Sequence, residues 1–205
     1  MIKVAYANVD DLNLSEAYKL LPESRKKKID SFRFEKDKKL SAGAYLLLDK
    51  MLKEEGIENP AFKIDKYGKA YISNYENIYF NLSHSGKLVA CAISDTEVGV
   101  DVEYNDSAID LNIAKNYFYN SEYENIMKAE NPSDEFFKYW VLKESYMKYT
   151  GLGFNLPLDS FEIIIDNEIT LKNKKHPKFS LFDVQNYKLA TCCKYNVKSC
   201  FKYNL

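Results

Sequence analysis

The segment EVGVDVE, Glu97–Glu103, constrains the fold more than any other stretch of this chain. Its valines alternate with Gly99, Asp101 and Glu103, which is the period of a β-strand. Successive side chains of a strand point to opposite faces, so both carboxylates are expected on one face. Like charges side by side repel, and a divalent cation with oxygen ligands, such as Mg²⁺, would offset that repulsion. The alternative is a solvent-facing edge strand with two ordinary acids, and the spacing alone leaves both interpretations open.

A second strong pattern is FFKYWVLKESYMK, Phe136–Lys148, which predicts a helix. Trp140, Glu144 and Lys148 are four residues apart, so they share one face of that helix. A Glu–Lys pair at this spacing is most often a solvated surface pair worth a few tenths of a kcal/mol. The acidic strand upstream favours a second interpretation, in which Glu144 supplies a third carboxylate to the same cation.

Composition and charge describe an ordinary soluble globular chain. The 205 residues are 46% hydrophobic and 29% charged, with 30 acidic against 29 basic side chains. This near-neutral balance gives no general basic surface for nucleic acid, so any anion site must be a local cluster. The N-terminus lacks the features of a signal peptide, no apolar run is long enough to span a membrane, and the four cysteines have no C-x-x-C spacing. We therefore expect a cytoplasmic protein with reduced thiols.

Shorter periodic segments predict the remaining elements. Strands are expected at Lys3–Ala7, Phe62–Ile64, Ala70–Ile72, Tyr79–Leu82, Leu88–Ser94, Phe161–Ile165, Ile169–Leu171, Lys178–Asp183 and Leu189–Tyr195. Helices are expected at Leu12–Leu20, Glu23–Phe32, Asp37–Glu55, Ile109–Phe118 and 121–129, the last opened by a capping box at Ser121–Glu124. Ser133 is the expected N-cap of the Phe136–Lys148 helix and Gly151 its stop, and the polar connection Ser83–Lys87 joins two strands.

The two halves of the sequence resemble each other weakly. Each has a long helix followed by strands, and FNLSHSGKLVACAIS (80–94) is similar to FSLFDVQNYKLATCCKY (179–195). This suggests duplication of one α+β unit, with residues 1–100 as the N-terminal half and 101–205 as the C-terminal half. An active site at the interface of the halves would follow, because clefts form between such units.

Two groups of basic and polar residues are candidates for binding an anion. Arg25 and Lys28 are three apart on the basic helix, which suits two-point capture of a phosphate, although such a charge run is most often a solvated face. Ser83, His84 and Lys69 could form an anion-binding lip, although a lone histidine in a turn is more often structural.

Taken together, these motifs resemble the Sfp-type 4′-phosphopantetheinyl transferases. NLSHSG (81–86), GVDVE (99–103) and WVLKESYMK (140–148) stand in the family's order and spacing, with YGK (67–69) upstream and GLGFNLPLD (151–159) downstream. Each motif alone is weak, but the ordered set is specific. The resemblance implies an α+β fold with a pseudo-twofold arrangement of two similar α/β halves. It also implies Mg²⁺-dependent transfer of 4′-phosphopantetheine from coenzyme A to a serine of an apo acyl or peptidyl carrier protein, releasing 3′,5′-ADP.

The resemblance further implies roles for individual residues. Asp101, Glu103 and Glu144 would hold Mg²⁺, with Mn²⁺ as an alternative, and Glu144 would accept the serine proton directly or through water. Lys148 would offset negative charge on the leaving 3′,5′-ADP. The implied phosphate ligands are Lys69, Ser83 and His84, with Arg25, Lys28 and Ser41 around the 3′-phosphate. Lys143 lies about 100° around the helix from Glu144, so Lys143 is better placed for a second phosphate contact or for a structural role.

Two rival functions use the same residues. One is a Mg²⁺-dependent hydrolase acting on coenzyme A or a nucleotide pyrophosphate, and the other is a non-catalytic binding module. For the transferase, a monomer without nucleic-acid or membrane partners is expected. Its carrier would dock on Ile109–Tyr123, a segment rich in aromatic residues. The alternative is that Ile113, Tyr117, Phe118 and Tyr119 of this segment pack into the core of the second half.

Overall fold

The computed structural model describes all 205 residues and has six α-helices around two main sheets. The first sheet has the strand order β11-β1-β5-β4 and the second β6-β10-β9. Their strands are β1 (Ile2–Asn8), β4 (Tyr79–Ser85), β5 (Leu88–Ser94), β6 (Val98–Tyr104), β9 (Lys178–Val184), β10 (Tyr187–Cys193) and β11 (Phe201–Tyr203). The helices are α1 (Leu14–Lys19), α2 (Glu23–Asp30), α3 (Glu35–Glu54), α4 (Asn112–Tyr117), α5 (Asn120–Lys128) and α6 (Pro132–Thr150). Two short hairpins complete the fold, β2 (Phe62–Ile64) with β3 (Ala70–Ile72) and β7 (Ile163–Ile165) with β8 (Ile169–Leu171).

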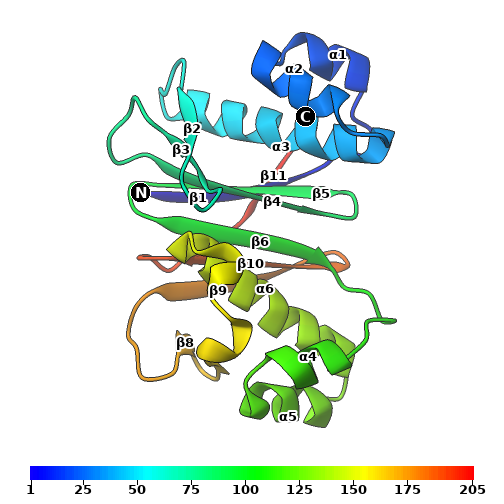
Figure 1. The fold of residues 1–205 in the computed structure, drawn as a ribbon, viewed down its shortest axis with the longest axis vertical. Helices are drawn as coiled ribbons and strands as arrows, with labels where there is room; N and C mark the ends of the chain where they lie inside the picture. Colours follow the sequence, from blue (N-terminus) through cyan, green and yellow to red (C-terminus); the bar gives the residue numbers. More distant parts are fainter.

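The two halves repeat one connectivity. In the first, strand β1 leads to helix α3, to the β2–β3 hairpin and to β4–β5, whose last strand pairs antiparallel with β1. In the second, β6 leads to α6, to β7–β8 and to β9–β10, whose last strand pairs antiparallel with β6. The predicted α+β fold of two similar halves is therefore confirmed (Figure 1).

The sheets lie face to face, with α3 outside one and α6 outside the other (Figure 1). Alternate residues of β5 pack under α3 and against the second sheet, which is why the whole strand is buried. Val98, Val100 and Val102 of β6 face the first sheet in this shared core. The opposite face of β6, with Gly99, is turned toward α6.

Gly99 allows α6 to lie directly on β6. A Cβ atom at this position would stand 2.0 Å from the Ser145 carbonyl oxygen and 2.5 Å from the Tyr149 backbone nitrogen. No side chain fits there without displacing the helix. Because Asp101 shares this face of the strand, the close approach brings Asp101 within reach of Lys148 on α6.

Several boundaries differ from those expected. The α6 helix begins at Pro132, and its N-cap is Asn131 rather than Ser133, because the Asn131 side chain accepts from the Asp134 N–H. Gly151 ends it as predicted, with φ of 73°.

The capping box predicted at Ser121–Glu124 is also wrong. The Glu122 carboxylate accepts from the Tyr119 N–H at 2.9 Å, so the capping box lies at Tyr119–Glu122 and α5 begins at Asn120. Ser121 does not cap the helix, and its hydroxyl donates to Glu162.

The connection predicted over residues 83–87 is wrong in extent, because β4 continues to Ser85 and only Gly86 and Lys87 form the turn. Strand β11 was not expected. It pairs parallel with β1 and so carries the end of the chain back to the first sheet.

Candidate active site

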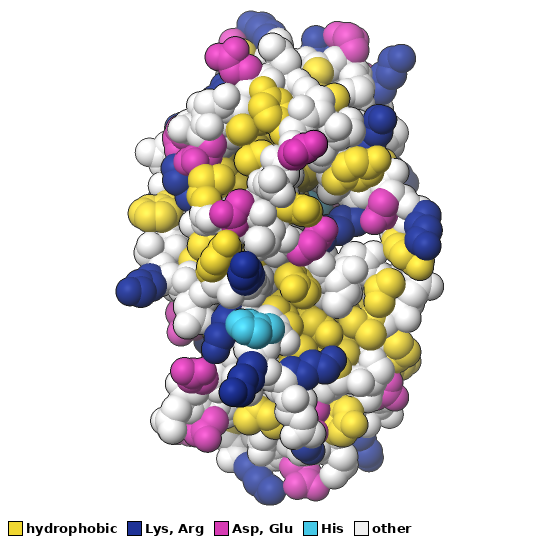
Figure 2. Space-filling model, turned by 90° about the vertical axis from the view of Figure 1, so that its left-hand side faces the viewer, with side chains coloured by type: hydrophobic (Ala, Val, Ile, Leu, Met, Phe, Trp, Pro, Cys, Tyr) yellow, Lys and Arg dark blue, Asp and Glu magenta, His cyan; other side chains and the backbone are white.

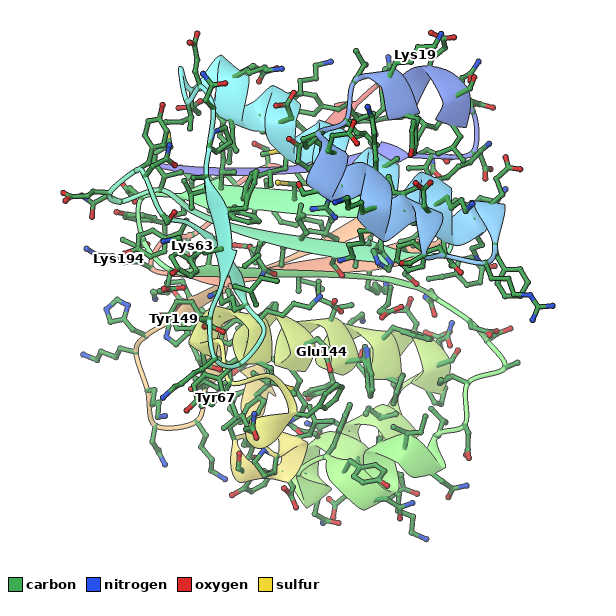
Figure 3. The ribbon with its side chains drawn as sticks, turned by 45° about the horizontal axis from the view of Figure 1, so that its top comes forward. Lys19, Lys63, Tyr67, Glu144, Tyr149 and Lys194 are labelled. Atoms are coloured by element: carbon green, nitrogen blue, oxygen red, sulfur yellow. The ribbon has the colours of Figure 1, made fainter.

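The two acidic motifs meet between β6 and α6. Asp101 is buried, with 2% exposure, and its Oδ1 accepts from Ser83 Oγ at 2.8 Å and from Lys148 Nζ at 2.7 Å. Glu103 lies on the same face of β6 and accepts from Ser85 Oγ at 2.6 Å. Glu144 projects from the middle of α6 (Figure 3). The strand and the helix therefore bring into one region the carboxylates that lie about forty residues apart in sequence.

The charge of Asp101 raises the pKa values of the two glutamates beside it. Burial first, and then the charge of Asp101, raise the pKa of Glu103 to about 7, while the Ser85 hydroxyl acts in the opposite direction. Burial and Asp101 likewise raise the pKa of Glu144, and Lys148 lowers it. The cluster is thus short of positive charge, although Lys148 offsets part of the repulsion.

The donor set fits a hard cation such as Mg²⁺. Asp101 Oδ2 and Glu144 Oε1 are buried without a hydrogen-bond partner. Buried polar atoms of this kind require a partner, and carboxylate oxygens are the ligands that Mg²⁺ prefers. The side chains are not gathered into a finished site, because no group of three or more His, Cys, Asp or Glu residues is arranged to hold a metal ion. Lys148 instead occupies one oxygen of Asp101.

A basic cavity of about 380 Å³ is connected to the carboxylates through Lys148, which lines it and contacts Asp101. Lys28, Lys69 and Lys148 line it, from α2, the β2–β3 connection and α6. Lys69 Nζ donates to Glu97 at 2.6 Å and to the Tyr149 carbonyl at 3.2 Å, which holds the hairpin against the end of α6. The tip of this hairpin, with Tyr67 and Gly68, lines the cavity together with Met147 and Gly151 at the end of α6. The cavity therefore lies between the halves, with cations contributed by both.

None of the other predicted phosphate ligands lines this cavity, and they do not form one lip. Ser83 faces β6, and alternation along β4 turns the exposed His84 to the opposite face. Partial desolvation and then the charge of Lys148 lower the pKa of the His84 ring, with a smaller contribution from Lys28.

Arg25 and Ser41 are placed by α2 and α3. Arg25 stacks over the Tyr45 ring at 5.1 Å from its centroid, on the face of α3 that also carries Ser41, one turn before Tyr45. Ser41 Oγ is buried without a partner. Neither residue lines the cavity formed by the three lysines.

Lys143 has a structural role in this molecule. It is fully buried and donates to Glu122 at 2.8 Å and to the carbonyls of Leu158 and Phe161. Its ammonium group also lies 4.3 Å from the centroid of the Phe161 ring. All three of its protons are used, so a phosphate contact is excluded in this arrangement.

The aromatic segment 109–123 divides between core and surface. Phe118 is buried and stacks on Phe136 with ring centroids 5.6 Å apart, so for this residue the alternative of core packing holds. Tyr117 is 59% exposed and, with Trp140 and the 85% exposed Phe154, lines an apolar pocket of about 440 Å³. One face of the molecule, in Figure 2, shows several Lys and Arg side chains around a histidine in its lower half, with acidic side chains and apolar patches spread over the rest.

Comparison with known proteins places this arrangement in a family. Residues 97–192 match the model of the 4′-phosphopantetheinyl transferase superfamily, and residues 9–96 match a model of the N-terminal part of 4′-phosphopantetheinyl transferases. An L-aminoadipate-semialdehyde dehydrogenase-phosphopantetheinyl transferase from Candida glabrata is 31% identical over 85% of this chain and 71% of that protein. The chain belongs to the 4′-phosphopantetheinyl transferase superfamily.

Bacterial members of the superfamily are somewhat more similar over a shorter span. A 4′-phosphopantetheinyl transferase from Bacillus subtilis is 36% identical over 64% of this chain and 62% of its own length. The transferase gsp of Aneurinibacillus migulanus is 38% identical over 66% of this chain and 59% of its own length. The chain thus spans about three fifths of the length of these relatives. None of its helices has the length and apolar character needed to cross a membrane.

Sequence reasoning missed three residues that build the site of this superfamily member. Gly99 lets α6 approach β6, Asn81 binds β6, and Ser85 binds Glu103. A signal for the last two was present, because Asn81, Ser83 and Ser85 alternate with period two. The shorter strand predicted at Tyr79–Leu82 concealed it.

The raised pKa of Glu103 predicts a pH-dependent stability of the metal-free protein. Glu103 binds a proton more tightly in the folded protein, where its pKa is about 7, than in the unfolded chain, where its pKa has the ordinary value of 4.5. Between these values the folded state holds the extra proton, so the free energy of unfolding falls as pH rises. Glu103→Gln has no proton to lose, and it should melt above the unsubstituted protein at pH 8 but not at pH 5. Thermal melts in EDTA across this range, with the exposed Glu124→Gln as control, measure the difference. Parallel pH curves for Glu103→Gln and the unsubstituted protein would contradict it.

Proposed function

We propose that this chain transfers 4′-phosphopantetheine from coenzyme A to a serine of an apo carrier protein. The observation that carries the proposal is the adjacency of the two sites. A cluster of carboxylates short of positive charge stands beside a cavity lined by three lysines, and Lys148 belongs to both. A pyrophosphate bound with a divalent cation is complementary to this pair of sites.

The chemistry requires positioning and charge neutralisation more than covalent help. The serine oxygen of the carrier attacks the phosphorus attached to the pantetheine, the pyrophosphate P–O bond breaks, and 3′,5′-ADP leaves. Asp101, Glu103 and Glu144 would hold Mg²⁺ or Mn²⁺, which when bound supplies Lewis acidity and a template for the pyrophosphate. Glu144 accepts the serine proton, directly or through water, a role that its raised pKa supports.

Basic side chains from both halves bind the coenzyme. Lys69, Ser83 and His84 would hold phosphates of coenzyme A, with Arg25, Lys28 and the unpartnered Ser41 hydroxyl around the 3′-phosphate. Lys148 leaves its contact with Asp101 and pairs with the leaving 3′,5′-ADP, whose negative charge it offsets. Residues 1–100 thus supply most of the coenzyme contacts and residues 101–205 the metal-binding helix and strand.

The remaining expectations belong to the same proposal. The protein acts as a monomer in the cytoplasm, without nucleic-acid or membrane partners, and accepts carriers of peptide, polyketide or fatty-acid synthesis. Its reaction is that of a holo-[acyl-carrier-protein] synthase.

Incubation with coenzyme A, Mg²⁺ and an apo carrier, followed by mass spectrometry of the carrier, tests the function directly. The carrier should gain one phosphopantetheine. Asp101→Asn and Glu144→Gln should lower the rate about 10²-fold or more, the scale of losing a preorganised charge-stabilising group, while the exposed Glu124→Gln should not. Cleavage of coenzyme A with no gain in carrier mass would select the hydrolase. Near-normal transfer by either variant would refute the metal assignment.

Coenzyme recognition predicts a difference between coenzyme A and its 3′-dephospho form. Lys28→Ala should weaken coenzyme A selectively, and Lys69→Ala should weaken both forms, by roughly 10- to 100-fold if each charged contact contributes about 1.5–3 kcal/mol. Calorimetric titration with both ligands measures the two losses, and exposed Lys27→Ala on the same helix is the control. Equal losses for Lys28→Ala would move Lys28 to the pyrophosphate. Unchanged binding by Lys69→Ala would leave Lys69 only its contacts with Glu97 and Tyr149.

We place the carrier-docking surface at the apolar pocket lined by Tyr117, Trp140 and Phe154, rather than over the whole segment 109–123. Tyr117→Ala and Phe154→Ala should each raise the carrier KM by roughly 10-fold, since interface aromatics commonly contribute more than about 1 kcal/mol. The melting temperature and coenzyme A affinity should not change. Phe118→Ala is the contrasting variant, because loss of its buried ring should lower the melting temperature. An unchanged carrier KM in both exposed variants would move the docking surface elsewhere.

A further inference from the structure

Three side chains of β4 form a regular ladder to β6. Asn81 Oδ1 accepts from the Val100 N–H at 3.0 Å, Ser83 Oγ from the Val102 N–H at 3.3 Å, and Ser85 Oγ from the Tyr104 N–H at 3.1 Å. Each acceptor lies nineteen residues before its donor. The two strands belong to different sheets and have no backbone ladder between them.

The ladder satisfies an edge that would otherwise be unpaired. β6 is the outer strand of its sheet, and its other edge pairs with β10. In an antiparallel pair, alternate N–H groups point away from the partner strand, and an unsatisfied buried one is costly. The side chains of β4 supply the missing acceptors.

The two serines of this ladder also bind the carboxylates. A serine hydroxyl has one proton, and its oxygen can accept a further bond. Ser83 uses that proton for Asp101, and Ser85 uses it for Glu103 at 2.6 Å. Because each oxygen also accepts from the β6 backbone, the orientation of the hydroxyl is determined. The carboxylates are thereby held relative to the backbones of both halves.

We infer that Ser85 is a positioning residue, whose hydroxyl holds Glu103 in the orientation that a divalent cation requires. This inference rests on the proposed function. Ser85 is the only residue that hydrogen-bonds the Glu103 carboxylate in this structure. Ser83 acts similarly on Asp101, but it also contacts Lys148 at 2.9 Å and so belongs to the binding machinery. Ser85 has no such contact, and it therefore isolates the positioning effect.

Binding of Mn²⁺ to the whole protein, followed by electron paramagnetic resonance, tests the inference without relying on turnover. Ser85→Ala should weaken Mn²⁺ about 10-fold or more, as loss of a residue that orients a metal ligand commonly does. Ser85→Thr keeps the hydroxyl and should recover most of the affinity. Ser73→Ala, which removes an exposed serine bonded to the Ala61 carbonyl, should have no effect. The Tyr104 amide should also exchange faster with solvent in Ser85→Ala than in Ser85→Thr.

The outcomes separate the inference from the function on which it rests. If the unsubstituted protein binds Mn²⁺ and modifies the carrier while Ser85→Ala binds Mn²⁺ equally well, only the positioning role is overturned. Equal weakening by Ser85→Ala and Ser85→Thr also overturns it, since the hydroxyl would not be the cause. If the unsubstituted protein binds no Mn²⁺, the proposed metal site falls, and the inference falls with it.

Discussion

The lateral contact between β4 and β6 is the constraint on which the rest of the structure depends. The valines of β6 pack the second sheet against the first, but apolar packing is non-directional and allows the strands to slide. The side-chain ladder from Asn81, Ser83 and Ser85 is directional, and a slip of one residue would reverse the faces of the strand. At roughly 1 kcal/mol for each hydrogen bond, the ladder adds only modestly to stability, and its main effect is to fix the register of the two strands.

Charge is treated differently in the two buried clusters of the second half. Lys143 and Glu122 form a pair in which the ammonium also reaches two backbone carbonyls, so the ionic groups are matched. Asp101 and Glu144 instead each keep a buried oxygen without a partner. Two of the six buried side-chain oxygens without a hydrogen-bond partner lie in this carboxylate cluster, and the other four belong to Ser41, Asp95, Glu162 and Thr191. This contrast favours a binding role for the carboxylates Asp101 and Glu144 and a structural role for Lys143.

Local periodicity predicted most of the fold. The alternation in β6, the apolar stripe of α3 and the four-residue spacing in α6 are properties of short segments, and the elements they predict are present. Errors fell where a competing local contact decides the boundary. Asn131 caps α6 because Pro132 favours the first helical position, and Glu122 caps α5 two residues before the expected place. Strand β11 has only three residues, and its partner β1 is at the opposite end of the chain.

By itself, the sequence determined that Asp101 and Glu103 share one face of a strand and that Glu144 and Lys148 share one face of a helix. It also predicted the family, because the order of the motifs is a linear property of the chain. Only the tertiary structure decided which of these groups meet. The distance between β6 and α6 depends on the missing Cβ at Gly99, and the orientation of Glu103 depends on a hydroxyl from the other half. Such contacts join residues far apart in sequence, and no local spacing encodes the packing that brings them together.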